Sequence, residues 1–167
     1  MSDINDPTWR QSLSDVVVAE GRYLDERDWD AWLDLYTDDA EYWVPCWADE
    51  DTLTSDPHNS LSLIYYGSRG GLEDRIYRIR TGQSLASTPL ARTCHMNSNF
   101  KYEHAGDNEW KVHSSWSTQS FRLKQAHQFF GIQTHTVVRR DNQLKISRRY
   151  VVVMNDVIPS VLDVYHV

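Results

Sequence analysis

Cysteine is scarce in this chain, and its scarcity limits the redox and metal chemistry open to it. Cys46 and Cys94 are the only cysteines among 167 residues, and two do not make a disulfide framework. We therefore expect both to be reduced thiols that pack in the interior. No CxxC, HExxH or GxSxG motif and no glycine-rich phosphate loop occurs. The sequence thus lacks the signatures of a serine hydrolase, a helical zinc protease and a nucleotide-binding site.

Long apolar runs and an excess of positive charge are missing as well. No apolar run approaches the roughly 20 residues that a membrane span needs, and the mean hydropathy is −0.61. The first residues, MSDINDPTWRQS, contain no apolar signal-peptide core. We therefore expect a cytoplasmic protein without a membrane partner. A formal net charge of −7 disfavours nucleic-acid binding, which depends on neutralising phosphates.

Aromatic residues, by contrast, are abundant. Seven tryptophans and nine tyrosines are more than a core of this size requires. Either they line a broad core or cavity, or they form a large protein interface, because Trp, Tyr and Arg are enriched at interface hot spots. The length fits one domain over residues 1–167, and an apolar content of 40% is enough for a core.

The N-terminal half has helical periodicity interrupted by short extended segments. Residues 7–27 are expected to form an amphipathic helix that begins at Asp6-Pro7. A second short helix follows and is expected to end at Asp38-Asp39, before a strand. Residues 61–66 fit either a strand or a helical turn. Gly70-Gly71 should then break the chain ahead of a helix over residues 72–80.

The C-terminal half alternates between apolar and polar residues with the period of strands. Two of the turns between these strands are marked by Gly106-Asp107-Asn108 and Asp141-Asn142. Helices followed by an antiparallel meander are typical of an α+β fold, in which a curved antiparallel sheet wraps around the N-terminal helices. The expected strands cover residues 92–103, 110–124, 127–140 and 143–155.

The histidines do not form a metal-binding motif. Seven of them are scattered along the chain, and a Rieske cluster needs paired Cys and His motifs, whereas Cys94 is followed directly by His95. A site of two His and one carboxylate needs no fixed spacing. Most of the histidines nevertheless fall on expected strands, where a position on a sheet face is the simpler interpretation.

Proton-transfer catalysis is the open alternative. A conical α+β fold with a deep apolar pocket suits it, because burial tunes a lone carboxyl or imidazole. Asp39, at the expected end of the second helix, and His95, within an expected strand, could form a buried Asp/His pair. If neither residue is catalytic, Asp39 would simply end the helix at a turn, and His95 would be an ordinary strand residue. A stand-alone isomerase or dehydratase is therefore the second hypothesis.

Several sequence blocks, running nearly end to end, carry a family resemblance. They are Glu20 and Tyr23, Trp32 to Tyr36, Tyr42-Trp43-Val44-Pro45, Asp56-Pro57, Ser62-Leu63-Ile64-Tyr65-Tyr66, Gly71-Leu72-Glu73-Asp74-Arg75, Arg78, Pro89, Arg92-Thr93, His95, Asn97, Asn99 and Arg148-Arg149-Tyr150. In these blocks the chain resembles the small (β) subunits of aromatic-ring-hydroxylating dioxygenases, within the benzoate and anthranilate-like group.

This resemblance implies a fold, a function and a set of partners. The fold would be cystatin-like, of the nuclear-transport-factor-2 type. The chain would be the non-catalytic, mainly structural small subunit of an NADH-dependent terminal oxygenase that acts on an aromatic carboxylate. A catalytic large (α) subunit would carry the Rieske [2Fe-2S] cluster and the mononuclear Fe(II), and this chain would hold no cofactor. The resemblance further implies an α3β3 assembly with contacts between β subunits, and a separate reductase that supplies electrons.

Residues 56–81 contain most of the side chains that we expect at the subunit interface. They combine many Arg and acidic side chains with an apolar framework, a composition that fits a permanent partner surface. Arg69, Arg75 and Arg78 are expected to pair with carboxylates there, although Asp74 and Arg75 could instead form an internal ion pair. Arg92 is expected to share one sheet face with His95, Asn97 and Asn99. The candidate interface residues are Tyr65, Tyr66, Arg69, Asp74, Arg75, Arg78 and Arg92.

Overall fold

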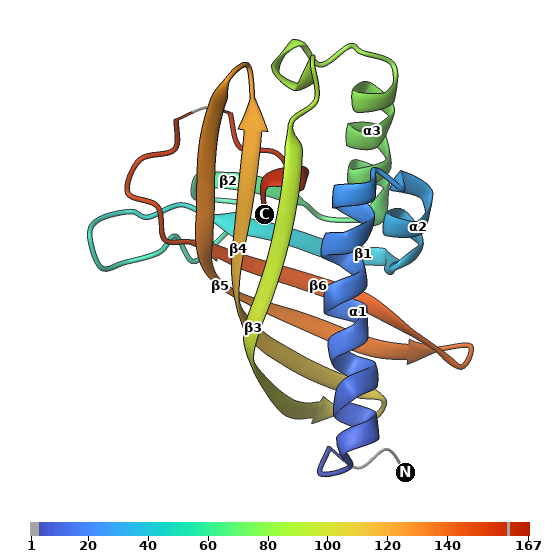
Figure 1. Ribbon diagram of the computed structural model, residues 1–167. Helices are drawn as coiled ribbons and strands as arrows, with labels where there is room; N and C mark the ends of the chain where they lie inside the picture. The colour runs from blue at the N-terminus through green and yellow to red at the C-terminus, as the bar shows by residue number, and fades with distance from the viewer. Residues whose placement is uncertain (1–3, 160) are drawn as a thin grey trace.

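A curved sheet of six strands, with helices on its inner side, organises the chain (Figure 1). The computed structural model describes residues 4–159 and 161–167. The strand order is β2-β1-β6-β5-β4-β3. The expected α+β class is therefore confirmed. The elements are α1 (Pro7–Glu26), α2 (Trp29–Asp34), β1 (Tyr36–Pro45), β2 (Ser62–Tyr66), α3 (Arg69–Arg80), η1 (Leu85–Ser87), β3 (Arg92–Gly106), β4 (Glu109–Arg122), β5 (Gln125–Arg140), β6 (Gln143–Val153) and η2 (Val164–His166).

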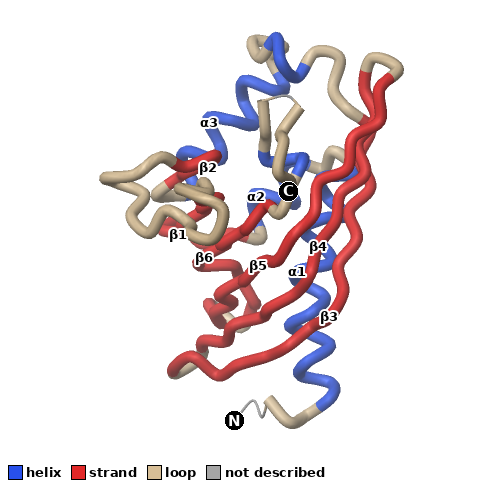
Figure 2. The backbone as a smooth tube through the Cα atoms, turned by 90° about the vertical axis from the view of Figure 1, so that its left-hand side faces the viewer, coloured by secondary structure: helices blue, strands red, loops and turns tan. Residues whose placement is uncertain are grey.

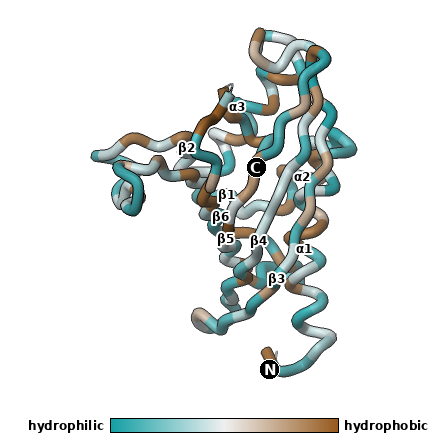
Figure 3. Tube along the Cα trace, turned by 60° about the vertical axis from the view of Figure 1, so that its left-hand side comes forward, coloured by the Kyte–Doolittle hydropathy of each residue, from teal (hydrophilic) through white to brown (hydrophobic). Residues whose placement is uncertain are grey.

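Helix α1 forms where the sequence predicts it. The Asp6 carboxylate caps it by accepting from the Thr8 amide at 2.9 Å, and Pro7 occupies the first turn. The helix ends at Glu26 and is followed by the capping residue Arg27, whose φ of 60° is left-handed. Brown and teal residues succeed one another along α1 in Figure 3, because one face packs on the sheet and the other meets solvent.

Strands β3 to β6 form the predicted antiparallel meander. Its turns contain the left-handed residues Asn108, Asp141 and Asn142, with φ of 58°, 48° and 62°. Asn and Asp tolerate that conformation because their short polar side chains hydrogen-bond locally. The remaining turn uses Leu123 and Lys124 at φ of 51° and 65°, residue types that give no turn signal.

Strand β1 departs from the prediction in two ways. It runs parallel to β6, with Trp43 opposite Tyr150, so the sheet is mixed and not wholly antiparallel. It also begins at Tyr36, so Asp38 and Asp39 lie within a strand and do not end the second helix. The cause is tertiary: Tyr36 is buried and pairs with Ile146 of β6, and this packing overrides the local turn preference of two aspartates.

The glycine pair also differs from expectation. Gly70 and Gly71 lie inside the first turn of α3, after the extended Ser68, and do not break the chain. Strand β2, one of the two options for residues 61–66, leads into this helix. A Cβ on Gly71 would lie 2.6 Å from Cδ1 of Tyr66. The glycine is therefore required for the close approach of α3 to β2.

Nine of the twenty aromatic residues are buried in the core. Trp32, Trp110, Tyr36, Tyr42 and Phe129 are among the largest fully buried side chains, and Trp32 packs edge-on against Tyr36 with ring centroids 5.2 Å apart. The expectation for the cysteines was wrong for one of them, since Cys94 is exposed on β3 and only Cys46 is partly covered. No helix in the described part of the chain is long and apolar enough to cross a membrane.

Candidate functional site

A buried charged network lies inside the curve of the sheet. Its centre is Glu20 of α1, whose carboxylate lies 2.7 Å from Nε2 of His135 and 3.1 Å from the Arg149 guanidinium. The Tyr36 hydroxyl donates to the same carboxylate. Arg149 also donates to the Tyr42 hydroxyl at 2.8 Å. Each carboxylate oxygen therefore has a donor, as a buried charge requires.

Local sequence explains how these groups meet. Glu20 is four residues after Val16 and four before Leu24, so it points to the same inner side of α1 as those apolar residues. His135 of β5 pairs directly with Arg149 of β6, which puts both side chains on one face of the sheet. An acidic residue in the middle of an apolar helix face was the one sequence signal for this network.

Burial and neighbouring charges shift the pKa values of Glu20 and His135 in opposite directions. Burial alone would raise the pKa of Glu20, but Arg149 and His135 outweigh it and hold that pKa at about 2. Burial lowers the pKa of His135, and the attraction of Glu20 only partly offsets this. His135 is therefore neutral at pH 7 and donates its Nε2 hydrogen to an ionised Glu20.

Acidification is expected to destabilise the chain in two steps. Both folded-state pKa values lie below their ordinary values of 6.5 and 4.5, so the unfolded chain binds protons first as the pH falls. Stability should decrease below pH 6.5 through His135, and further below pH 4.5 by on the order of 3 kcal/mol through Glu20. His166, whose pKa burial lowers to about 4, adds to the first step.

Urea unfolding between pH 2 and pH 8 measures this dependence. His135→Gln cannot protonate, so the first step should shrink in this variant while the second remains. A free energy of unfolding that stays constant as the pH falls from 7 to 4 would contradict the assignment of a neutral His135 beside an ionised Glu20.

The predicted Asp39/His95 pair is wrong. Asp39 is exposed on β1. His95 instead binds Asp25 of α1, with Nδ1 2.6 Å from one carboxylate oxygen and its amide 2.9 Å from the other. Its Nε2 has no hydrogen-bond partner and is closed off from solvent. The carboxylate orients the imidazole as in a general base, but a substrate cannot reach the nitrogen that would take the proton.

The C-terminal segment fills the wide end of the curved sheet, between the sheet and α3 (Figure 2). Val164, Tyr165 and Val167 are buried. The Tyr165 hydroxyl lies 2.9 Å from Oγ of Ser87, and the Val167 carbonyl accepts from Arg149 at 3.2 Å. The space that would hold a substrate in a hollow cone is therefore occupied by the chain's own side chains.

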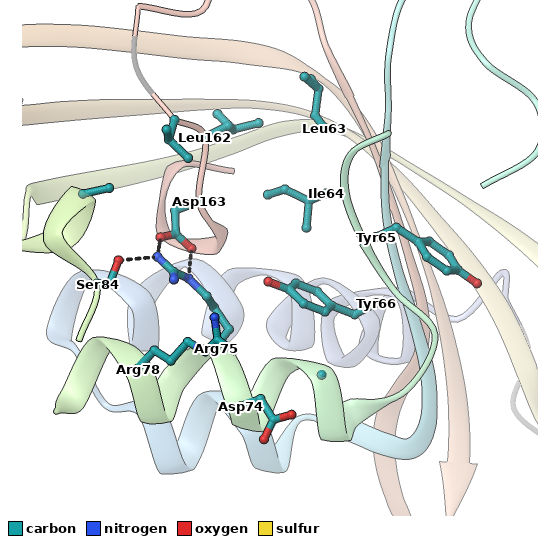
Figure 4. Close-up of a pocket in the computed structure, with 13 residues that line it drawn as sticks. Leu63, Ile64, Tyr65, Tyr66, Asp74, Arg75, Arg78, Ser84, Leu162 and Asp163 are labelled. Carbon is teal, nitrogen blue, oxygen red and sulfur yellow. Dashed lines mark hydrogen bonds and ion pairs between the residues drawn. The ribbon is translucent and has the colours of Figure 1, made fainter. Parts of the chain in front are cut away.

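A surface pocket lies beside the buried C-terminal segment, between β2, α3 and residues 161–163 (Figure 4). Its cavity volume is about 520 Å³. Leu63, Ile64 and Leu162 supply apolar wall. Arg75 crosses it and donates Nε to Asp163 at 2.9 Å in a two-pronged contact, and the same guanidinium donates to Ser84 at 2.9 Å. Asp163, the residue that fixes Arg75, had no signal in the sequence.

The arginines predicted to face a partner differ in whether their guanidinium groups already form ion pairs within the chain. Arg69 is engaged within the chain, with ion pairs to Asp38 at 3.0 Å and Glu73 at 2.9 Å. The internal Asp74–Arg75 pair is wrong, because Arg75 uses Asp163 and Asp74 is exposed on α3. Arg78 is also exposed and lines the pocket. Arg78 is thus the guanidinium most available to a partner's carboxylate.

Two of the remaining candidates line the pocket and the third lies elsewhere. Tyr65 and Tyr66 both line the pocket, and the ring of Tyr65 also packs edge-on against His58. Arg92 lies on β3 with its guanidinium 5.1 Å from the centre of the Phe121 ring. It does not share a face with His95, which points inward to α1, because positions 92 and 95 have opposite parity along the strand. That part of the prediction was wrong.

The described residues offer no ligand set for a metal. Nowhere within residues 4–159 and 161–167 do three or more His, Cys, Asp or Glu side chains gather in a way that could hold an ion. A mononuclear iron site of two His and one carboxylate needs such a group. We therefore derive no chemical step through iron on these residues.

Comparison with known proteins gives one consistent family. The family model described as "Ring hydroxylating beta subunit" matches residues 19–160. The toluate 1,2-dioxygenase subunit beta of Pseudomonas putida is 41% identical over 94% of this chain and 97% of its own length. The benzoate 1,2-dioxygenase subunit beta of Acinetobacter baylyi is 40% identical over 94% of this chain and 93% of its own.

Solved structures agree on the fold. The beta subunit of benzoate 1,2-dioxygenase from Burkholderia mallei superimposes with a TM-score of 0.79 at 36% identity, covering 100% of this chain and 99% of that one. A protein with a cystatin-like fold from Nostoc punctiforme superimposes with a TM-score of 0.62 at 12% identity, covering 92% of this chain and 96% of that one. The second likeness concerns the fold alone and confirms the expected cystatin-like class.

Proposed function

The chain belongs to the family of ring-hydroxylating beta subunits, and from this premise we propose that it is the small subunit of a terminal oxygenase that hydroxylates an aromatic carboxylate of the benzoate class. Its role is to hold a catalytic large subunit in place, and it carries no catalytic residue of its own. Its site of action is the cytoplasm. The substrate class rests on relatives named for toluate and benzoate.

The observation that carries the structural role is the filled interior. In this fold a substrate would enter between the sheet and the helices, where Tyr165, Val167 and the Glu20 network lie. The side chain with the geometry of a general base, His95, has its free nitrogen buried. A chain that fills its own cavity supports a scaffold role better than a pocket enzyme.

The partners follow from the same proposal. The large subunit holds the Rieske [2Fe-2S] cluster and the mononuclear iron, and a separate reductase delivers electrons from NADH to it. Three large and three small subunits form the complex. This chain provides a binding surface that holds the large subunits in place, and the large subunit carries out the catalysis.

Co-expression with the large subunit tests this proposal. The two chains should elute together as a high-mass complex with equal amounts of each. Iron and ring hydroxylation should both require the large subunit. Turnover of an aromatic acid by the isolated chain, or failure of the two chains to co-purify, would overturn it.

Residues Tyr65 to Arg80 are proposed to contact or support the large subunit. Arg78 is exposed and lines the pocket, and the exposed Tyr77 precedes it on α3. Arg69 and Arg75 are engaged with acids of this chain, so they fix the shape of the surface. The Arg78 guanidinium can pair with a carboxylate across the interface.

Arg78→Glu is expected to weaken binding to the large subunit more than tenfold. Losing one member of an interfacial charge pair costs about 2–5 kcal/mol, and each 1.4 kcal/mol is a factor of about ten. Lys101→Glu makes the same charge change on an exposed residue in the second half of β3, and Lys101 does not line the pocket beside Arg78. This control should bind as the wild type does. Equal affinities of the two variants, measured by titration calorimetry, would remove Arg78 from the interface.

A further inference from the structure

The surface pocket drawn in Figure 4 contains polar groups that the chain itself leaves without a partner. Arg75 donates from Nε and Nη2 to Asp163 and Ser84, but no described residue accepts from its Nη1. The Tyr66 hydroxyl also has no hydrogen-bond partner in the described part of the chain, and Arg78 forms no ion pair there. Unpaired polar groups that face one cavity are typical of a ligand-binding site.

The three groups converge on one region of the pocket. Figure 4 shows the Tyr66 hydroxyl directed toward Arg75 and Asp163. Burial and the Asp163 carboxylate raise the pKa of Tyr66, and the positive charges of Arg75 and Arg78 partly counteract this rise. Both guanidinium groups therefore lie near the hydroxyl, which stays protonated at pH 7 and can donate a hydrogen bond. Arg75 and Arg78 are three residues apart on α3, a spacing that makes them neighbours on the helix surface.

Arg75 is held in place before any ligand arrives. Asp163 accepts from it in a two-pronged contact, and the oxygens of Ser84 and Ser87 accept from the same guanidinium at 2.9 and 3.1 Å. Arg75 and Asp163 expose only 18% and 6% of their side chains. A side chain fixed in this way loses little further conformational freedom when a ligand binds, so its Nη1 is a preorganised donor.

The rest of the pocket offers an apolar wall. Leu63 and Ile64 come from β2, and Leu162 comes from the segment that leads into η2. The cavity volume of about 520 Å³ lies within the roughly 300–1,000 Å³ of small-molecule sites. A wall of this kind takes up a hydrocarbon ring, because burying apolar surface is favourable.

We infer that this pocket is a binding site for a small monocarboxylate that carries a single apolar ring. The carboxylate accepts hydrogen bonds from Nη1 of Arg75, from the Tyr66 hydroxyl and from the Arg78 guanidinium. The ring packs on the apolar wall. A planar carboxylate suits these donors because guanidinium groups match its geometry and strengthen the bond by their charge.

The charges around the pocket favour a ligand with one negative charge. Asp163 already compensates Arg75. Asp74 also lines the pocket, but it is exposed on α3, where solvent and salt screen its charge. Among the described residues that line the pocket, Arg78 is therefore the positive charge still to be neutralised. A dianion such as phosphate would leave a negative charge without a partner beside Asp163.

Titration calorimetry of the purified full chain with benzoate tests the inference. We expect saturable binding at one site with a dissociation constant on the order of 0.1–1 mM, as the ligand efficiency of small ligands allows. Benzamide keeps the ring and lacks the charge, whereas inorganic phosphate is an anion without a ring. Both should bind at least tenfold more weakly than benzoate.

Two variants locate the binding in this pocket. Tyr66→Phe keeps the ring that packs against Tyr42 and removes only the hydroxyl, and Arg78→Gln removes the unpaired cation. Each should weaken benzoate binding about tenfold, because each removes a hydrogen bond to a charged group. Arg80→Gln removes the same charge from an exposed residue of α3 that does not line the pocket. This control should bind benzoate as the wild type does.

The outcomes separate this inference from the proposed function, because the titration involves no large subunit. Absence of saturable benzoate binding, equal binding of benzamide or phosphate, or wild-type affinity in either pocket variant overturns the inference. Equal losses in Arg78→Gln and Arg80→Gln would reflect general charge and also overturn it. If benzoate does not bind while Arg78→Glu still weakens capture of the large subunit, the pocket belongs to the partner surface alone. Unchanged urea midpoints show that the variants fold.

Discussion

Arg149→Met is expected to lower the free energy of unfolding by about 3–5 kcal/mol, because it leaves a buried carboxylate without its cation. Glu20 and Arg149 expose only 2% and 3% of their side chains, so water cannot replace the lost partner. Gln133 and Tyr42 would lose their donor as well. Urea unfolding of the isolated chain at pH 7 measures the effect.

Two further variants make this result specific. Arg148→Met removes the neighbouring arginine, which is half-exposed and pairs with Glu41, and a surface pair of this kind contributes about 1 kcal/mol or less. The double variant Glu20→Gln with Arg149→Met removes both charges and should recover part of the loss. Equal losses for Arg148→Met and Arg149→Met would mean that the network does not carry the stability assigned to it.

Tyr165→Ala is expected to cost about 3–5 kcal/mol, since it empties space that a large buried side chain fills. Tyr165 is 3% exposed and packs against His166 with ring centroids 4.5 Å apart. Tyr165→Phe keeps the ring and loses only the hydrogen bond to Ser87, so it should cost about 1 kcal/mol. Tyr77→Ala, at a residue that is 60% exposed, should change stability by about 0.5 kcal/mol or less.

A small apolar ligand provides an independent readout of the same cavity. Benzene should raise the unfolding temperature of Tyr165→Ala more than that of the wild type, because it binds an empty apolar cavity in the folded state. An equal rise in both proteins, with a small loss of stability in Tyr165→Ala, would show that the interior is not closed by this segment.

Local signals were sufficient for about half of the fold. The α1 cap at Asp6-Pro7 and the Asn- and Asp-containing turns were predictable, since the side chain itself favours the conformation. Strand β1 was not, because Asp38 and Asp39 favour a turn, and they lie in a strand only because Tyr36 and Glu41 on either side of them pair with the distant β6. The Leu123-Lys124 turn could not be predicted for a related reason. Neither residue type prefers a positive φ, and the pairing of the flanking strands imposes that conformation.

The sequence predicted which residues gather at the candidate site, but it did not predict which of their side chains form ion pairs. Residues 56–81 do gather Arg78, Tyr66 and Asp74 around one pocket. The partner of Arg75 is Asp163, nearly ninety residues later, and spacing carries no information about such a contact. His95 was a reasonable candidate for an acid–base pair, yet its acid is Asp25 of α1. Whether residues 65–80 touch a large subunit stays a prediction.

The parallel pairing of β1 with β6 has a consequence for how the protein is made. Strand β1 emerges early in synthesis, but its partner lies about a hundred residues further along, and such long-range pairing is slow to form. Until β6 arrives, β1 and β2 form a two-stranded ribbon, which is marginal alone and exposes an unpaired edge. A nascent chain stalled before residue 143 would therefore be open to aggregation, and recruitment of any partner must wait for the last strand.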